Sequence, residues 1–321
     1  MKLEDLRALT AHFQGVSQPD YGQVKSLLTE LGLDPDNLYQ ELEMSHRFVQ
    51  VHRDESYSNS ILQLHSHTFY EILCCRSDCG AEYLVGTERY RLQKGDIIFV
   101  PPGISHRPLL PEQMPKPYTR DVLWISEEFV EILQNAFTRH EVQPHGHSSL
   151  LRTANTKWDY LSGMLREAVQ ESERKSADWE IAVTGSAMTF MSHLKRAFLD
   201  RSTTAIAAEK PDLLGEIMAY MEENLAEKIT LAGIARHFYV SESTIRQTFQ
   251  KKMGTGFHRC LTQRRLITAK QLIEEGCLLE QVALRTGFSD YSAFYRAFRQ
   301  EYGISPRQYR SMREMKKYGP Q

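Results

Sequence analysis

The 321-residue sequence lacks the marks of several large protein classes. Its five cysteines are an odd number without paired zinc-type spacing, which argues against a disulfide-rich secreted scaffold and fits a reducing compartment. No apolar run approaches the roughly 20 residues that a bilayer-spanning helix needs. The first residues, Met1 to Asp5, lack the basic-then-apolar order of a signal peptide. We therefore expect a cytoplasmic protein with no membrane partner.

The chain also lacks a strong net charge, but its two parts differ in sign. The 39 lysines and arginines nearly balance the 41 acidic residues, for a net charge of −2. Residues 211–321 hold 17 basic and 12 acidic residues, a balance of +5, whereas residues 1–210 have a balance of −7. Phosphate contacts supply most of the sequence-independent affinity for nucleic acid, so only the C-terminal part suits a polyanion.

This C-terminal part contains one pattern twice. The pair Ile234-Ala235 aligns with Val282-Ala283, and after a shift of one residue Ser243, Ile245, Phe249 and Gly254 align with Ser292, Phe294, Phe298 and Gly303. Thr230 and Ser241 are typical N-caps for the two helices of the first copy, and Gly254 and Gly303 are typical helix ends. The pattern predicts a duplicated helix-turn-helix, with one long connecting helix over residues 257–275.

The second helix of each copy has a polar face opposite its buried stripe. Ile245 and Phe249 form the stripe in the first copy, and Phe294 and Phe298 form it in the second. Residues on the polar face are of the types that read base edges or hold phosphates. These candidate DNA-binding residues are Ser243, Arg246, Gln247, Gln250 and Lys251, then Tyr291, Ser292, Tyr295, Arg296 and Arg299. Two such helices can enter neighbouring major grooves, about 34 Å apart on B-DNA. The alternative for any single residue is that it only solvates its helix.

At these residues the chain resembles the AraC/XylS family of bacterial transcription factors. The matching pattern is Gly287-Phe288, Asp290, Ser292, Phe294, Arg296, Phe298, Gly303, Ser305-Pro306 and Tyr309-Arg310. The resemblance implies a two-module domain that binds double-stranded promoter DNA. It also implies a homodimer that activates transcription with RNA polymerase, and a sensor domain for a small-molecule effector.

The N-terminal half contains short strand-like segments broken by glycine turns, for example residues 82–85 and 97–100. This spacing predicts an antiparallel barrel or jelly roll over residues 46–125. Within it, His65, His67 and Glu71 are separated by even numbers, so in one strand their side chains would share a face.

Together with His106, these residues resemble the paired motifs of the cupin superfamily, although Leu110 stands where that family often has Asn. In AraC-type sensor domains a similar strand often has no metal, so we expect no cofactor. A divalent transition metal held by His65, His67, Glu71 and His106 is the alternative. The effector site is expected to add aromatic side chains that stack on a sugar. Its predicted residues are His65, His67, Phe69, Glu71, Tyr83, Phe99, His106 and Trp124. Cys74, Cys75 and Cys79 are interpreted as small apolar residues of strands and turns, and a thiol sensor at these positions is the alternative.

The remaining segments are predicted to be helical. Residues 1–45 form an N-terminal extension, and residues 126–201 form a helical region with Ser126 as an N-cap and a loop over residues 138–155. The apolar spacing of its two long helices, over about 157–174 and 178–199, suits core packing or a dimer interface. Residues 202–211 form a linker.

The sequence thus predicts an α+β protein, with a cupin-like barrel and flanking helices followed by an all-α tandem helix-turn-helix domain at 212–321. The favoured function is a ligand-responsive, sequence-specific transcriptional regulator, expected to be an activator and not an enzyme. Its cupin-like domain is expected to sense a small molecule such as a sugar or related metabolite. No nucleophile, second base or glycine-rich phosphate loop is evident in the sequence. The alternative is a metal-dependent cupin enzyme, such as a sugar isomerase or dioxygenase, fused to a DNA-binding domain.

Overall fold

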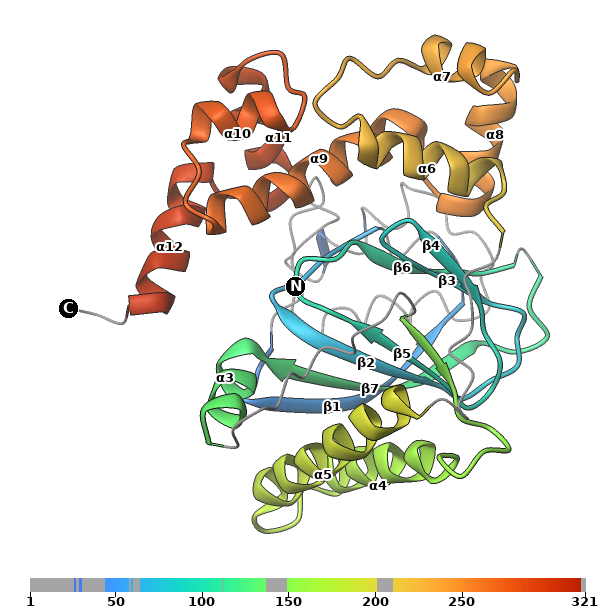
Figure 1. Ribbon diagram of the computed structural model, residues 1–321, viewed down its shortest axis with the longest axis vertical. Coiled ribbons are helices and arrows are strands. Elements are labelled where there is room, and N and C mark those ends of the chain that lie inside the picture. The colour runs from blue at the N-terminus through green and yellow to red at the C-terminus, as the bar shows by residue number, and fades with distance from the viewer. Residues whose placement is uncertain are drawn as a thin grey trace.

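The computed structural model describes residues 26, 29–30, 44–57, 59, 64–111, 113–136, 149–200 and 210–318. Its N-terminal half contains two antiparallel sheets (Figure 1). The first has the strand order β1-β7-β2-β5-β8, and the second has the order β4-β3-β6. The strands are β1 Val49–Ser56, β2 Phe69–Cys75, β3 Glu82–Val85, β4 Glu88–Arg91, β5 Asp96–Val100, β6 His106–Leu109, β7 Tyr118–Ser126 and β8 Leu150–Arg152.

The alternation of side chains along the strands builds two cores, one on each face of the five-stranded sheet. In β2, Phe69 and Leu73 point between the two sheets, whereas Tyr70 and Ile72 point to the opposite face. The barrel-like part of the α+β prediction is therefore confirmed.

The strand β8 corrects the predicted loop over residues 138–155 and the predicted end of the barrel at residue 125. Leu150 pairs with Ile98, and Asp96 pairs with Arg152, so β8 completes the edge of the five-stranded sheet. A three-residue strand is too short to show a period in the sequence. Its place in the sheet is decided by burial of Leu150 and Leu151.

Three helices follow the barrel: α3 Glu127–Ala136, α4 Tyr160–Arg174 and α5 Trp179–Leu199. The predicted N-cap at Ser126 is confirmed, since its Oγ accepts a hydrogen bond from the Phe129 amide at 3.2 Å. Helices α4 and α5 cover the outer face of the five-stranded sheet (Figure 1). Core packing accounts for the buried apolar positions Leu161, Leu165, Val169, Met191 and Leu194. It does not account for Ile181, which is 73% exposed.

The C-terminal half is helical, as predicted. Its helices are α6 Leu213–Glu223, α7 Leu231–His237, α8 Glu242–Met253, α9 Phe257–Glu274, α10 Leu279–Arg285, α11 Tyr291–Tyr302 and α12 Pro306–Tyr318. The predicted N-caps Thr230 and Ser241 accept hydrogen bonds from the amides of Gly233 and Thr244. Most of the predicted N-terminal extension and of the linker lies outside the described residues.

The two helix-turn-helix units have matching turns, and they explain the one-residue shift of the repeat. The Val240 amide donates to the Ala235 carbonyl, and the Phe288 amide donates to the Ala283 carbonyl in the same way. The next N-caps are Ser241 and Asp290. The additional residue of the second copy is therefore Ser289.

The helical half packs directly on the outer face of the three-stranded sheet (Figure 1). Leu64, Leu84 and Leu109 of the barrel share one buried cluster with residues of α6 to α9, including Ile217 and Phe249. The layers therefore run from α4 and α5 through the two sheets to the helix-turn-helix domain. No helix in the described ranges is both long and apolar enough to cross a membrane.

Asp212 links three elements at this junction, and its protonation should weaken the junction in acid. It caps α6 and accepts hydrogen bonds from Gly215, from Arg89 of β4 at 2.6 Å, and from Lys252 of α8. Burial opposes ionisation, but the bonds from Lys252, Gly215 and Arg89 outweigh it and lower the pKa of Asp212 to about 2.

A carboxylate with a lowered pKa stabilises the fold above its unfolded pKa, and this stabilisation is lost as the pH falls through the folded value. We therefore expect the free energy of unfolding to fall between pH 3.8 and about pH 2 partly through Asp212. Urea unfolding at several pH values should show a smaller fall for Asp212→Asn, which retains a capping oxygen. An equal pH dependence of the free energy of unfolding in the wild type and the variant would contradict this role of Asp212.

Candidate effector pocket and DNA-binding surface

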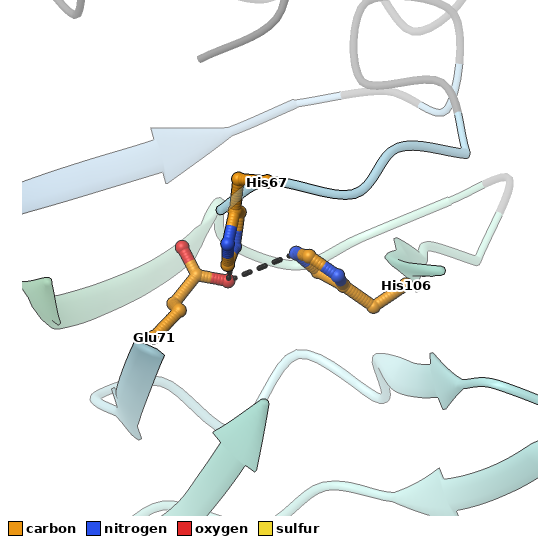
Figure 2. A group of neighbouring side chains, drawn as sticks. All are labelled: His67, Glu71 and His106. Atoms are coloured by element: carbon orange, nitrogen blue, oxygen red, sulfur yellow. Dashed lines mark ion pairs between the residues drawn. The ribbon is translucent and has the colours of Figure 1, made fainter. Parts of the chain in front are cut away.

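Three buried polar side chains converge between the two sheets. Figure 2 shows His67, Glu71 and His106 pointing toward one another. Glu71 lies in β2, His106 begins β6, and His67 lies in the segment before β2. The Glu71 Oε2 atom is 3.1 Å from His106 Nε2 and 3.7 Å from His67 Nε2. We call these three residues the His-Glu cluster.

The hydrogen bonds around the cluster leave three polar atoms facing one another. The His67 Nδ1 atom is 2.8 Å from the Phe69 carbonyl, and the His106 Nδ1 atom is 2.8 Å from the Ile104 carbonyl. A carbonyl only accepts, so each Nδ1 carries a proton, and each Nε2 faces the Glu71 carboxylate. The Trp124 Nε1 atom donates to the other oxygen of Glu71 at 2.8 Å. The remaining atoms, both Nε2 and Glu71 Oε2, have no hydrogen-bond partner within the described part of the chain.

Such an arrangement can bind a group that carries positive charge or donor hydrogens. Burial opposes ionisation of Glu71, but His106 and His67 outweigh it and hold its pKa well below its usual range. Burial also lowers the pKa of His67, with partial compensation by Glu71. A buried carboxylate beside two imidazoles can accept hydrogen bonds from hydroxyl groups of a ligand, and with both Nε2 atoms unprotonated the three groups can coordinate a divalent cation. All three ligand atoms lie within 4.8 Å of one another, which is close enough for one ion after a small adjustment.

The structure brings most of the predicted effector residues to this cluster. The ring of Phe69 stacks on His67 at 3.9 Å, Trp124 is 4.6 Å from Phe69, and Tyr83 is 6.3 Å from His106. His65 lies at the edge, with its ring 4.2 Å from that of His106.

Two details of the predicted site are wrong. Residues 65–67 do not continue the strand of Glu71, because β2 begins at Phe69 and His65 makes only an isolated bridge with His106. Phe99 is not in the pocket, because it pairs with Ile72 on the opposite face of the sheet and packs against Phe198 of α5. Sequence alternation alone does not say which parity of a fully buried strand faces inward.

The cysteine cluster does not favour a thiol sensor. Cys74, Cys75 and Cys79 are buried and free. Burial raises the pKa of Cys74 and of Cys75 to about 12, so the reactive thiolate is disfavoured. Their interpretation as small apolar residues fits these surroundings better.

The polar faces of α8 and α11 lie open to solvent as predicted. In α8 the stripe of Ile245 and Phe249 is fully buried. The candidate DNA-binding residues of α8 are exposed, namely Ser243, Arg246, Gln247, Gln250 and Lys251. Arg246 forms an ion pair with Glu242 one turn earlier, at 2.7 Å, and must leave it to reach a base.

Helix α11 has the same organisation. Phe294 and Phe298 are fully buried, and Asp290 caps the helix by accepting from the Ala293 amide at 2.7 Å. Among the candidates, Ser292, Arg296 and Arg299 are exposed, whereas Tyr291 and Tyr295 are half-buried. Their rings are 6.3 Å apart, so they pack partly against each other.

Sequence reasoning missed a cleft between the barrel and α9. Its volume is about 530 Å³, and His67 and Gly103 line it from the barrel while Lys270 and Gln271 line it from α9. These residues are far apart in the chain and carry no shared motif. Only the docking of the two domains brings them together.

Comparison with known proteins agrees with this organisation. A protein-family profile described as "Helix-turn-helix domain" matches residues 234–312. The transcriptional activator RhaS of Salmonella schwarzengrund is 27% identical over 253 residues, which cover 78% of this chain and 88% of that protein. RhaS of Salmonella typhimurium is 26% identical with the same coverage.

Several solved structures are also similar to this chain, and two of them differ in how much of it they cover. A DNA-binding transcriptional dual regulator from Escherichia coli K-12 is 28% identical, covers 34% of this chain and 99% of its own, and has a TM-score of 0.31. ToxT from Vibrio cholerae is 16% identical, covers 83% of this chain and 100% of its own, and has a TM-score of 0.34.

The C-terminal part of the chain is therefore a helix-turn-helix domain, and the structure shows that it contains two such units in tandem. The two RhaS proteins, which align with most of this chain, are transcriptional activators.

Proposed function

We propose that this protein is a ligand-responsive transcriptional activator. Its tandem helix-turn-helix domain binds promoter DNA through α8 and α11, and its barrel senses a small polar molecule of the sugar type. The observation that carries the proposal is the docking of the DNA-binding domain on the barrel that contains the His-Glu cluster. A ligand that alters the barrel thereby acts on a surface that the DNA-binding domain shares.

The chemistry of the pocket supports a polyhydroxylated effector. The Glu71 carboxylate can accept hydrogen bonds from hydroxyl groups, the two Nε2 atoms lie beside it, and Phe69 and Trp124 offer apolar ring faces. His67 also lines the cleft between the barrel and α9, and the far wall of this cleft belongs to α9. A sugar in this region would contact both domains.

Replacement of His67 by alanine should weaken the effector response and leave basal DNA binding largely unchanged. Thermal-shift screening against a sugar and metabolite panel should first identify the effector, since ligand at 100 times its dissociation constant adds about 2.7 kcal/mol of stability. The titration is then repeated with His67→Ala. His193→Ala is a matched control, because His193 lies on α5 and contacts Tyr160. An unchanged titration for His67→Ala would remove this residue from the pocket.

A metal-dependent enzyme on the barrel is the second candidate, and the convergence of three possible ligand atoms favours it. Two imidazoles and one carboxylate suit Fe²⁺, Mn²⁺ or Zn²⁺. The residues that would hold the ion are His67, Glu71 and His106, with His65 outside the group. Elemental analysis of purified protein should separate the candidates. Stoichiometric metal that is lost in Glu71→Gln would support a metal centre, whereas metal-free protein that binds a sugar would exclude it.

We propose further that the protein acts as a homodimer together with RNA polymerase. Support for a dimer comes from α5, where Ile181 and Leu199 are 73% and 62% exposed. Burial of such side chains against a second copy would be favourable. Sedimentation equilibrium of the Ile181→Asp variant should show a shift toward monomer. An unchanged mass would exclude this helix as the interface.

A further inference from the structure

Strand β6 lies between the His-Glu cluster and the DNA-binding domain, and its side chains alternate between them. His106 points into the barrel, where its Nε2 atom faces Glu71. The next residue, Arg107, has the opposite direction and reaches α8 of the DNA-binding domain. One strand therefore carries a pocket residue and a residue that contacts the other domain.

Arg107 is fully buried and has main-chain partners. Its exposure is 0%, and its guanidinium donates to the carbonyls of Met253, Asn59 and Pro108. The bonds to Asn59 and Pro108 are 2.9 Å and 3.0 Å long. Burial lowers the pKa of Arg107 to about 10, which leaves it charged at neutral pH. A charged group in this position is expensive unless its donors are satisfied, so its bonds to the carbonyls are strongly orienting.

The partner Met253 is the last residue of α8, the first recognition helix. Carbonyl groups at a helix C-terminus carry partial negative charge and lack intrahelical partners, so a guanidinium is a fitting cap. The neighbouring Gly254 ends the helix with a φ of +61°, and a Cβ there would lie 2.8 Å from the Asn59 carbonyl. The end of α8 is thus held closely against the barrel.

Two other polar contacts of the barrel reach the connecting helix α9. The Gly103 carbonyl accepts from Gln271 of α9 at 2.9 Å, and the Gly86 carbonyl accepts from Arg264 of α9. These contacts hold the domain as a whole. Arg107 differs because its bond ends on the backbone of α8 itself.

We infer that Arg107 is a positioning residue for DNA recognition, by which the sensor barrel sets the orientation of α8 in its half of the operator. The inference rests on the proposed function. It assigns the residue a role without contact to DNA, and it makes β6 the structural link between the effector pocket and the first recognition helix.

The test uses full-length protein and duplexes selected from a randomised library. Wild-type protein should select a site with two halves, and Gln247→Ala identifies the half that α8 reads. The Arg107→Met variant should lose base preference in that half and bind the wild-type site about tenfold or more weakly, with preference in the α11 half retained. Arg107→Lys, which keeps the charge but not the fork of donors, should restore part of the preference.

Arg120→Met is the matched control. Arg120 is another buried arginine of the barrel, but it bonds to Ser56 at 2.8 Å within β1 and β7. This variant should retain the preference of both halves. Equal weakening of both halves in Arg107→Met, or an unchanged site and affinity, would overturn the inference. If Arg107→Met does not fold, Arg107→Lys serves as the test: weaker base preference in the α8 half alone supports the inference, and an unchanged site or equal weakening of both halves overturns it. Failure of wild-type protein to select any duplex would instead contradict the proposed function.

Discussion

Replacement of Phe298 by alanine is expected to destabilise the protein by about 3–5 kcal/mol and to remove binding to one half of the operator. Phe298 is fully buried, and its ring lies 5.5 Å from Phe294, 4.6 Å from Tyr302 and 5.7 Å from Tyr309. It anchors α11 to the rest of the second helix-turn-helix unit. Loss of the ring leaves a cavity under the recognition helix, so the orientation of α11 is no longer defined.

Chemical denaturation and binding to a selected duplex would measure the two effects together. Leu284→Ala is a suitable control, because Leu284 belongs to the same unit but is 63% exposed. Its effect on the free energy of unfolding should stay within about 0.5 kcal/mol. A Phe298→Ala protein with wild-type stability would show that the predicted stripe is not the core of this unit.

The Arg296→Ala variant is expected to lose about 1–3 kcal/mol of binding free energy and to relax preference at one base pair. Arg296 is exposed on α11, where its guanidinium can make a bidentate contact to guanine. Arg246→Ala should act similarly in the other half of the site. The loss of binding free energy should be smaller there, because Arg246 must give up its ion pair with Glu242 before it contacts DNA.

Lys251 provides the contrast, because it lies near the end of α8 and is better placed for a phosphate. Its replacement by alanine should weaken binding to all sequences alike and lower the salt slope by about one. The variants can be compared on a randomised-site library at several salt concentrations. If Arg296→Ala and Lys251→Ala weaken every sequence equally, α11 does not read bases in the major groove.

The tight docking of the two domains bears on how an effector would act. The barrel contributes Leu84 and Leu109 to the core under α6 to α9, so the two domains do not move independently while this core is intact. Relative movement would expose those leucines to water, at a cost of about 25 cal/mol for each Å². A small shift of β6 therefore costs less free energy than separation of the domains, and is the more favourable way to transmit effector binding.

The sequence by itself determined the elements whose signals are local. The caps at Thr230 and Ser241 and the terminal glycines Gly254 and Gly303 act within one helical turn, so the tandem helix-turn-helix was readable residue by residue. The convergence of His67, Glu71 and His106 was also predicted, from the even spacing of His65, His67 and Glu71 and from the resemblance of these residues and His106 to paired cupin motifs.

Only the tertiary structure decided which side chains meet across the sheets and between the domains. The outward direction of Phe99, the short strand β8 and the bond from Arg107 to α8 depend on partners distant in the chain. A strand that is buried on both faces has apolar residues at every position, so its sequence does not show which side chains point into the pocket. The contact between residues 107 and 253 leaves no periodic pattern in the sequence. Local hydrogen bonds and side-chain period specify the elements, whereas their docking is selected by the apolar surface that they bury together.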